Sequence, residues 1–313
     1  MHSVSPKVGI VLVNYNGLRF LPDCLKSIRA ADYPNFVITL VDNASTDGSI
    51  EWLENNYPDI TIIKLKENLG ITGGNNAGMR WCLENGCDWI MLLNNDTVVE
   101  PDFLTKLIAH ASPNLLIMPR IYFFDDKSRL NNHFGSFDYL RGVHKDIFYN
   151  KQDTVMSEAV QEGTMGNTCA LLFSRHVPEL IGLQDEQYFI YFDDTDFITR
   201  AVRHGYRVIY APDSIIYHKE SSSSGGGSSP LSVYYNTRNR LYFMFKHQRN
   251  PIALGFFLCY FTMTRLVWAV LLLSRGDKRL LRVMYNAMED YSRGRMGKAD
   301  AARFMSQVSS VSK

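Results

Sequence analysis

Three polar residues, Asn94, Asn95 and Asp96, follow the apolar run Ile90 to Leu93 in the stretch WIMLLNNDTVVE. The apolar run predicts a short buried strand, and the polar residues fall where that strand leaves the core. Ligands of open α/β sheets bind in the crevice beyond the strand ends. A carboxylate there can hold a hard divalent cation, which in turn can hold a diphosphate. The same residue types also favour turns, so the motif alone fits either interpretation.

A second candidate for chemistry is the acidic pair Asp193 and Asp194, which begins a predicted helix that ends near His204. A carboxylate within hydrogen-bond reach of a hydroxyl can take its proton as that hydroxyl attacks. Capping and the helix dipole also favour two Asp residues at a helix start, which leaves a structural explanation open. His218 follows a short strand-like run. It could be a metal ligand, because neutral imidazole suits Mn²⁺, or an ordinary surface or core histidine.

The ends of the first two predicted strands also carry polar side chains. Asp42 ends the second strand in VDNASTDGS. Its carboxylate could accept the imide N–H of uracil or thymine, or it could serve in a helix cap or an Asx-turn. The residues that follow the first strand could close over a base or a ribose: Asn14, Tyr15 and Asn16. No GxGxxG follows that strand, which excludes a dinucleotide-binding fingerprint.

Four glycines in ENLGITGGNNAGM surround the expected start of the third helix, near Gly74. A glycine-rich loop lets the backbone approach a ligand closely, and a helix N-terminus favours negative charge. A simple glycine-rich turn is the alternative.

The N-terminal part of the chain alternates between strands and helices. Its β-rich runs are at 8–14, 36–42, 61–66 and 89–93, and its helical segments include two that end near residues 56 and 85. This alternation predicts βαβ units, right-handed crossovers and an α/β fold with a mostly parallel sheet covered on both faces. The ends of the first, second and fourth strands should then line one crevice. We expect a domain over 1–230, with two halves that divide at about residue 125 (to about 125 and 126–230), and a helical region over 231–313.

Composition narrows the class of protein. The chain has 313 residues and 46% hydrophobic residues, enough for one large core with an appended unit. Its five cysteines are odd in number and none are spaced as CxxC, so we expect reduced thiols in a cytoplasmic protein with neither a zinc site nor a disulfide framework. The N-terminal stretch has no apolar signal core, and no export signal is expected.

The C-terminal region is basic and apolar. Residues 236–313 contain 14 Lys/Arg and 4 Asp/Glu, a net charge of +10, whereas the remainder has 19 against 28, or −9. Residues 252–273 carry a single charge, Arg265, and are long enough to span a membrane. A central arginine costs about 2.5 to 3.5 kcal/mol on insertion scales, and basic residues flank both ends. We therefore expect helices that lie on an anionic membrane surface, with a buried helix as the alternative. Truncation after about His247 should then give a more soluble, more acidic protein.

The order of the motifs is more informative than any one of them. VNYNG, VDNASTDGS, ENLGITGGNNAGM and LLNNDT closely resemble the nucleotide-binding half of the inverting glycosyltransferase family 2. YFIYFDDTDFITRAVRHGYRV, IIYHKESSS and YYNTRNRL look like its acceptor half. The resemblance spans about residues 8–245 and is closest to bacterial rhamnosyltransferase-like members that build cell-surface polysaccharides.

The resemblance implies a GT-A-like fold and a donor site that binds a nucleotide sugar with a divalent cation, Mn²⁺ or Mg²⁺. Asp42 would contact the base, and Asp96 and His218 would bind the metal. Asn94 stands where the family motif has its first Asp, which removes one charge from the metal site. The other residues that would line the nucleotide-sugar pocket are Asn14, Tyr15, Asn16, Asn68, Gly74, Asn75 and Asn95, and Arg238 would contact the diphosphate or close the Ser/Gly segment 221–230.

On the acceptor side, the resemblance makes Asp194 the general base. Asp193 and Asp196 would orient the base or hold the acceptor, and Asn167 would contact the acceptor. The Ser/Gly segment is either a linker or a loop that orders on ligand.

The function implied is inverting transfer of a sugar, first choice rhamnose from dTDP-rhamnose, to a saccharide or lipid-linked saccharide at the inner face of the cell membrane, with no nucleic-acid partner. Three alternatives remain: a UDP-hexose or UDP-HexNAc transferase of the same family, a sugar-phosphate nucleotidyltransferase, and a non-catalytic membrane scaffold. The early glycine-rich triphosphate loop of a nucleotidyltransferase is absent from the sequence.

Overall fold

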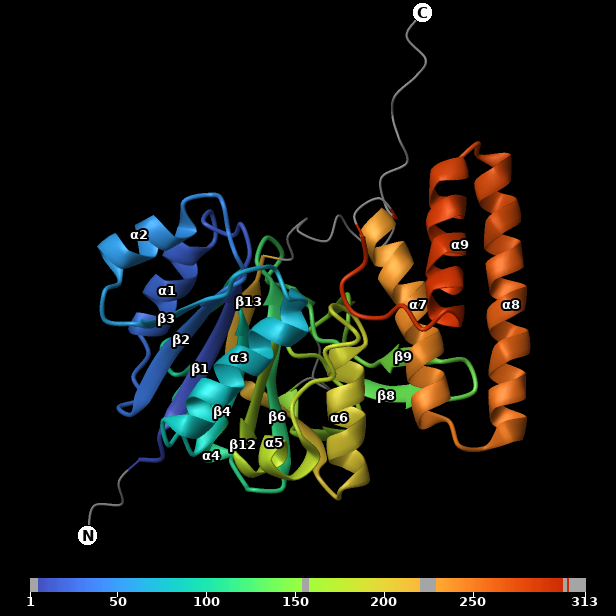
Figure 1. The fold of residues 1–313 in the computed structure, drawn as a ribbon. Helices are drawn as coiled ribbons and strands as arrows, with labels where there is room; N and C mark the ends of the chain where they lie inside the picture. The colour runs from blue at the N-terminus through green and yellow to red at the C-terminus, as the bar shows by residue number, and fades with distance from the viewer. Residues whose placement is uncertain (1–4, 154–157, 220–228, 301–302, 304–313) are drawn as a thin grey trace, which may run out of the picture. The chain divides into compact units, whose positions relative to one another are not determined.

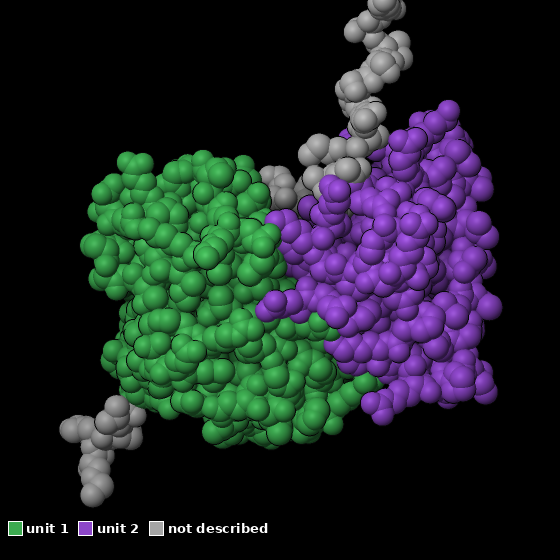
Figure 2. All heavy atoms as spheres, in the orientation of Figure 1, with its two compact units in different colours: residues 1–136, 144–185, 193–220 green, residues 137–143, 186–192, 221–313 purple. Residues whose placement is uncertain are grey.

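The computed structural model describes residues 5–153, 158–219, 229–300 and 303 (Figure 1). The chain divides into two compact units, which Figure 2 shows in separate colours. The first unit comprises 1–136, 144–185 and 193–220, and the second comprises 137–143, 186–192 and 221–313. Two short internal segments of the expected first domain, 137–143 and 186–192, and its last residues, 221–230, therefore belong to the second unit. Most of the Ser/Gly segment, residues 221–228, lies outside the described residues.

The first unit is built on a sheet whose N-terminal part is parallel. Its strands are β1 (Val8–Asn14), β2 (Phe36–Asp42), β3 (Thr61–Lys64) and β4 (Trp89–Asn94), in the order β3-β2-β1-β4. In register, Asn14 lies opposite Asp42, and Val13 lies opposite Asn94. The predicted parallel sheet is confirmed, and the ends of β1, β2 and β4 meet at one edge.

β1 is a nearly continuous apolar run that is buried along most of its length, which requires cover on both faces of the sheet. Ile10 and Leu12 belong to the core that includes Leu21 and Leu25 of α1 (Leu21–Arg29). The next helices are α2 (Ser49–Asn56), α3 (Gly70–Glu84), α4 (Phe103–Ala109), α5 (His176–Ile181) and α6 (Asp193–Arg203).

Beyond β4 the sheet becomes mixed, because β12 (Ala170–Ser174) is antiparallel to both β4 and β6 (Leu115–Phe123). The strand β13 (Arg207–His218) then runs parallel to β6. β13 is one strand whose register with β6 shifts between Ala211 and Ile215. Pro119 of β6 is the partner of Ala211 at this irregularity, where a proline is tolerated in a sheet.

The polar segment 125–153 that follows β6, called the excursion below, contains short strands. These are β7 (Arg129–Leu130), β10 (Lys151–Gln152), and the separate pair β8 (Gly135–Asp138) and β9 (Val143–Asp146). The remaining short strands, β5 (Thr97–Val99) and β11 (Gln161–Gly163), both pair with β13.

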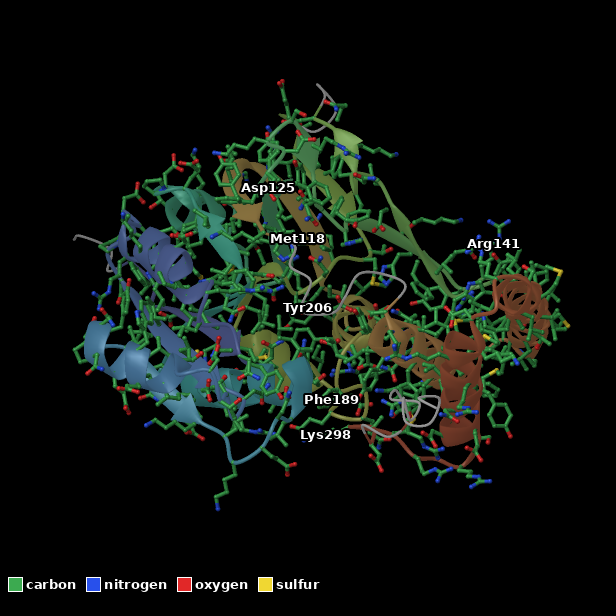
Figure 3. All side chains as sticks on the ribbon, turned by 90° about the horizontal axis from the view of Figure 1, so that it is seen from above. Met118, Asp125, Arg141, Phe189, Tyr206 and Lys298 are labelled. Atoms are coloured by element: carbon green, nitrogen blue, oxygen red, sulfur yellow. The ribbon has the colours of Figure 1, made fainter. Side chains whose placement is uncertain are left out.

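The second unit contains three helices, α7 (Pro230–His247), α8 (Pro251–Ser274) and α9 (Lys278–Ser292). Val233, Tyr234 and Tyr235 of α7 form a buried cluster with Val283, Met284 and Ala287 of α9. The 186–192 segment, which Phe189 marks in Figure 3, packs against this cluster. Within the described residues, α8 alone is long and apolar enough to cross a membrane, with a mean hydropathy of 1.9 and 17% of that window buried.

Candidate active site

A hydrogen-bonded network joins the polar residues at the edge of the parallel sheet. Asn14 is fully buried, and its Nδ2 donates to Asp42 Oδ1 at 3.0 Å and to Ser45 Oγ at 3.1 Å. Its Oδ1 accepts from Asn95 Nδ2 at 2.8 Å. The crevice predicted from the strand order therefore does bring Asn14, Asp42 and Asn95 together.

The loop after β1 is tied to the loop after β2. The Asn16 amide donates to Ser45 Oγ at 2.9 Å, and Asn16 Oδ1 accepts from the Thr46 amide at 2.8 Å. Asn16 adopts a left-handed backbone conformation with a φ of 51°, which asparagine tolerates better than most residues. Tyr15 beside it is 51% exposed. An exposed aromatic ring beside a rigid polar edge is suited to cover a base.

The glycine-rich stretch is not a loop, which corrects the prediction from the sequence. Residues 70–84 form α3, and a Cβ at Gly74 would lie 2.5 Å from Cγ1 of Val13. Gly74 therefore lets the helix pack closely on β1. The helix is fixed by Asn43, whose Oδ1 accepts from the Leu69 amide at 3.0 Å, and by Asn68, whose Oδ1 accepts from the Gly70 amide at 2.8 Å.

Asn75 is buried within the first unit, where its Nδ2 donates to Gln184 Oε1 at 3.1 Å. Its neighbour Asn76 donates to the Gln184 carbonyl and accepts from the Gln184 amide, both at 2.9 Å. These contacts anchor the segment after α5 to α3. They assign the Asn75 side chain to packing rather than to an open pocket.

The predicted metal ligands lie side by side. Asp96 Oδ1 and His218 Nε2 are 3.1 Å apart, and both side chains are largely buried. The Lys219 amide also donates to the Asp96 carbonyl at 2.9 Å, so β13 is fixed against the Asp96 turn. Burial lowers the pKa of His218, but the nearby Cys169 thiol and the Asp96 carboxylate outweigh this effect and hold the pKa well above its usual range.

A divalent cation fits this pair of side chains. The donors are a carboxylate oxygen and an imidazole nitrogen, which Mn²⁺ accepts, and Nδ1 of His218 is buried with no hydrogen-bond partner in the described part of the chain. No group of three or more His, Cys, Asp or Glu that could hold a metal occurs among the described residues. The protein would supply two ligands, and the donor diphosphate and water would supply the others.

A small cavity of about 230 Å³ lies beside His218 in the first unit. It is lined by the ends of β6 and β13 and by polar residues of the excursion: Phe123, Phe124, Asp125, Asp126, Arg129, Asn150, His218 and Lys219. Asp125, labelled in Figure 3, comes from the turn that follows β6.

The acidic pair begins α6, as the sequence predicts, and its two members have different surroundings. Asp193 is 3% exposed. Its burial raises its pKa well above the ordinary range, and the adjacent Asp194 carboxylate adds to the shift. Asp194 is half-buried and accepts from the Thr195 amide at 2.6 Å and from Thr195 Oγ1 at 3.1 Å.

A histidine that the sequence analysis did not identify completes this cluster. His144 Nε2 lies 2.9 Å from Thr195 Oγ1. Because the hydroxyl donates its single proton to Asp194, His144 must donate through Nε2–H. Burial lowers the pKa of His144, although the charge of Asp194 opposes this effect, and the imidazole is therefore neutral near pH 7. No local sequence signal marks His144, because 51 residues separate it from Thr195.

Two predicted acceptor residues have different environments. Asp196 is fully buried and accepts from Arg200 Nε at 2.7 Å. A buried carboxylate does not contact an acceptor, so that expectation is corrected. The alternative expectation, that Asp196 supports the catalytic base, is favoured. Arg200 in turn donates to the Leu183 carbonyl at 2.8 Å. Asn167 lies two residues before Cys169, and the Cys169 carbonyl accepts from the Asn94 amide at 2.8 Å. Asn167 is therefore at the same sheet edge as Asp96, which lies two residues after Asn94. Its Oδ1 is buried without a hydrogen-bond partner among the residues described.

Arg238 belongs to the second unit and has no exposed surface. Its guanidinium donates to the carbonyls of Gln187 and Tyr188 at 3.3 Å each and lies over the ring of Tyr235 at 4.9 Å. The neighbouring Asn239 Nδ2 donates to three carbonyls of the 188–191 segment, at 2.8 to 3.0 Å. These contacts correct the prediction that Arg238 binds the diphosphate. They fix the segment that leads directly into Asp193.

The first unit therefore contains a polar network at Asp42, a cation-compatible pair at Asp96 and His218, and an oriented carboxylate at Asp194. A model described as Glycosyl transferase family 2 matches residues 9–174, more than half of the chain. The chain belongs to glycosyl transferase family 2. The resemblance inferred from the motif order is thus confirmed, and the protein is a glycosyltransferase.

Individual relatives of this family 2 chain agree with the assignment. The dTDP-rhamnosyl transferase RfbF of Shigella flexneri is 26% identical over 78% of this chain and 82% of its own length. The N-acetylglucosaminyl-diphospho-decaprenol L-rhamnosyltransferase of Mycobacterium tuberculosis (strain CDC 1551 / Oshkosh) is 24% identical over 73% of this chain and 81% of its own length. Among solved structures, the mannosyltransferase PcManGT from Pyrobaculum calidifontis, in complex with GDP-Man and Mn²⁺, superposes with a TM-score of 0.56 and 16% identity over 93% of this chain and 88% of that one. This likeness confirms the predicted GT-A-like fold.

Proposed function

We propose that this family 2 enzyme transfers rhamnose from dTDP-rhamnose to a hydroxyl of a saccharide or lipid-linked saccharide in cell-surface polysaccharide biosynthesis. The names of the two rhamnosyltransferase relatives support this choice of sugar and of acceptor class. A UDP-hexose or UDP-HexNAc donor is the alternative within the family. Pocket details decide between donors, and fold alone does not rank them.

The observation that carries the catalytic proposal is the orientation of Asp194. Two hydrogen bonds from Thr195 hold its Oδ1, and His144 fixes the Thr195 hydroxyl. Its other oxygen can accept the proton of an acceptor hydroxyl as that hydroxyl attacks the anomeric carbon. One such attack, in line with departure of the nucleoside diphosphate, inverts the anomeric centre.

On the donor side, Asp42 and Tyr15 are proposed to bind the base, and Asn14 and Asn95 to fix the position of Asp42 and of the turn that follows β4. Mn²⁺ or Mg²⁺, held by Asp96 and His218, would supply positive charge for the diphosphate. With a single carboxylate ligand the protein's own affinity for the cation is weak, so cation and donor should bind together.

A donor screen tests the proposal. The purified protein is incubated with dTDP-rhamnose, UDP-glucose, UDP-GlcNAc and GDP-mannose, with Mn²⁺, Mg²⁺ or EDTA, and release of nucleoside diphosphate is followed. We expect slow, metal-dependent hydrolysis of dTDP-rhamnose. Asp42→Ala should raise the KM for this donor, because it removes the proposed contact with the base. Release of nucleoside diphosphate from a UDP-sugar and from no other donor would favour the alternative, a UDP-hexose or UDP-HexNAc transferase. If no donor releases nucleoside diphosphate and calorimetry detects no donor binding, the non-catalytic scaffold is favoured.

We also propose that the second unit attaches the enzyme to the inner face of the cell membrane. The side chains of α8 that are apolar and exposed include Ile252, Phe256, Leu266, Val267 and Val270. A face of this kind beside a basic region with a net charge of +10 is suited to an anionic lipid surface.

A further inference from the structure

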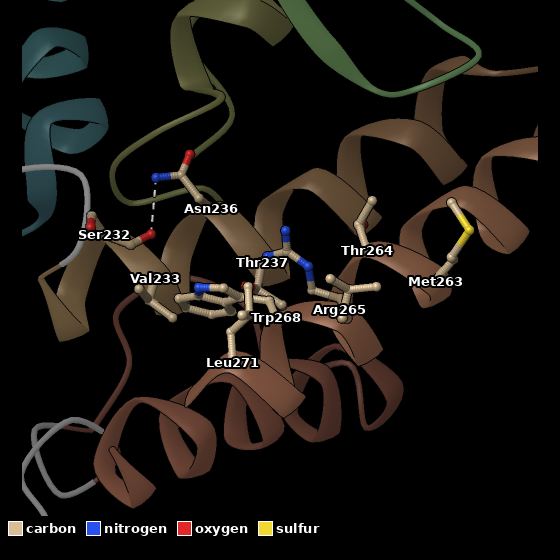
Figure 4. Close-up of a pocket in the computed structure, with 10 residues that line it drawn as sticks. Ser232, Val233, Asn236, Thr237, Met263, Thr264, Arg265, Trp268 and Leu271 are labelled. Atoms are coloured by element: carbon tan, nitrogen blue, oxygen red, sulfur yellow. Dashed lines mark hydrogen bonds between the residues drawn. The ribbon is translucent and has the colours of Figure 1, made fainter. Parts of the chain in front are cut away.

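The second unit contains a cavity of about 570 Å³ between α7 and α8, drawn in Figure 4. The residues that line it come from one turn and a half of α7 and from the middle of α8: Ser232, Val233, Asn236, Thr237, Met263, Thr264, Arg265, Val267, Trp268 and Leu271. No residue of the candidate active site is among them. The cavity therefore needs an explanation of its own.

The lining has a polar part and an apolar part. Ser232, Asn236, Thr237 and Arg265 carry hydrogen-bonding groups, whereas the α8 residues Met263, Val267 and Leu271 offer only apolar surface. Those three are 56%, 57% and 45% exposed, so the apolar part continues onto the open face of the helix. A ligand that fits both parts has a polar head and an apolar tail.

Two polar groups of the lining are buried without a hydrogen-bond partner in the described part of the chain. They are Oγ1 of Thr237, whose residue is 1% exposed, and Nε of Arg265. In Figure 4 the Arg265 side chain extends from α8 towards the residues of α7. A buried donor that lacks a partner costs about 1 to 3 kcal/mol, so such groups are usually satisfied by a ligand or by water.

The charge of the cavity is uncompensated as well. Arg265 lies over the rings of Phe261 and Trp268, and within the described residues no carboxylate pairs with it or with Arg240 of α7. Arg240 is outside the lining: its Nε is buried without a partner among the described residues, and its guanidinium donates to the Arg141 carbonyl. Burial lowers the pKa of Arg240 to about 10, and the nearby charge of Arg265 adds to this effect. The partly buried Arg265 guanidinium lines the cavity without a counter-ion, which favours binding of an anion there.

We propose that this cavity binds the phosphate ester of a lipid. Arg265 would pair with the phosphate oxygens, and the Thr237 hydroxyl would donate to them. Met263, Val267 and Leu271 would contact the first part of the hydrocarbon chain. Free phosphate shares the head-group chemistry but leaves the apolar lining uncovered, and a neutral lipid leaves the Arg265 guanidinium without a counter-ion. The site is separate from sugar transfer, so a test without nucleotide sugar is independent of the donor screen.

The test is calorimetric titration of the full chain with dihexanoyl phosphatidic acid below its micelle concentration. Parallel titrations use inorganic phosphate, which has no hydrocarbon chain, and dihexanoylglycerol, which has the same chains but no phosphate. We expect saturable binding of the phosphatidic acid, at least about 10-fold tighter than binding of either comparison ligand, because only this ligand uses both parts of the lining.

Two variants locate the site. Arg265→Gln should weaken binding of phosphatidic acid by about 10-fold or more, and Thr237→Val, which preserves volume, by about 3- to 10-fold. Arg279→Gln removes the same charge from an exposed position of α9 and should change the affinity by less than about 2-fold. Circular dichroism and thermal unfolding check that each variant is folded. If Arg265→Gln does not fold, Thr237→Val carries the comparison.

Each other outcome overturns a stated part of the proposal. Equal affinity for inorganic phosphate removes the lipid and leaves an anion site. Equal affinity for dihexanoylglycerol removes the role of the phosphate and of Arg265. Absence of binding to the folded protein, or unchanged binding in both variants, removes the site altogether.

Discussion

Asp193 and Asp194 are neighbours in the chain with opposite surroundings, and their chemistry should differ accordingly. Asp193 is buried with a raised pKa, whereas Asp194 is half-buried and held by Thr195. Environments that separate two carboxyl groups in this way commonly separate their roles in catalysis. We therefore expect Asp194→Asn to lower kcat by about 100-fold or more and Asp193→Asn to lower it by less than about 10-fold. Steady-state kinetics on the donor found in the screen gives both values, and wild-type turnover in Asp194→Asn would remove the assignment of the base.

The raised pKa of Asp193 also predicts how stability depends on pH. Its pKa in the folded state lies above the ordinary value of 3.8, so the group favours folding most below that pH and loses this contribution as the pH rises. Asp193→Asn removes the ionisation that burial opposes. The variant should unfold a few degrees above the wild type at pH 7, and the difference should shrink as the pH falls towards 4. Thermal unfolding across this range measures it, and a constant or inverted difference contradicts the pKa assignment.

Thr195 is a positioning residue, since it acts through Asp194. Thr195→Val keeps the volume and removes the hydroxyl that joins Asp194 to His144. We expect kcat to fall by about 10-fold and the acidic limb of the kcat–pH profile to move to higher pH, with the KM for donor unchanged. Thr195→Ser should restore most of the activity because it restores the hydroxyl. A fall in kcat without movement of the profile would indicate a purely structural role.

Residue types near strand ends were predictable from sequence, but side-chain partners distant in the chain were not. The strand-end positions of Asp42 and Asp96 follow from short-range patterns, and the structure places them as expected. His144 has no such pattern, because its partner Thr195 is on a different element. Arg238 was misassigned for the reverse reason: a cationic residue in a polar motif was expected to face a ligand, yet three-dimensional packing buries it completely.

At the scale of elements, the contact between α3 and β1 depends on glycine. A Cβ at Gly78 would lie 2.2 Å from Cγ1 of Val11, too close for an undistorted structure. Gly78→Ala should therefore destabilise the protein by about 1 to 3 kcal/mol, although alanine gains up to about 1 kcal/mol in helix propensity. Chemical denaturation measures the difference in the free energy of unfolding.

The matched control for this contact is the double variant Gly78→Ala with Val11→Ala, in which the added methyl group fills space that the valine has left. It should be more stable than the sum of the two single changes predicts. Strict additivity would show that the two residues do not meet.

The helix and strand pattern accounts for most elements but not for the join between the two halves of the sheet. β1 and β2 have the predicted bounds, whereas α3 begins four residues earlier than expected, at Gly70. Glycines were taken as a loop signal, and tertiary packing overrides that preference because the helix must approach β1 closely. β6 was not predicted, since Pro119 interrupts its apolar run, and only its pairing with the irregular part of β13 explains how a proline fits there.

At the scale of the whole molecule, the charge difference along the chain suggested that everything after His247 could be removed. The structure argues against that truncation. α9 covers the apolar face of α7, so removal of α9 would expose Val233, Tyr234 and Tyr235. We expect a chain that ends at His247 to aggregate, because the buried cluster of the second unit is shared between these helices.

The attachment of the second unit to membranes can be tested without such damage. Leu266 and Val270 of α8 are 63% and 65% exposed, so Leu266→Gln with Val270→Gln should leave the unfolding temperature unchanged. Each substitution removes roughly 1.5 to 3 kcal/mol of apolar burial in a lipid surface. The wild type should float with vesicles that contain phosphatidylglycerol, less so in high salt and less so with phosphatidylcholine alone, because the basic helices need an anionic surface. The double variant should lose most of this binding.

Extraction with alkaline carbonate distinguishes the two membrane arrangements of α8. A protein whose helix lies on the surface is released from the vesicles, whereas a protein whose helix spans the membrane stays with the lipid. We expect release, and retention would show that the single charge of Arg265 does not prevent insertion.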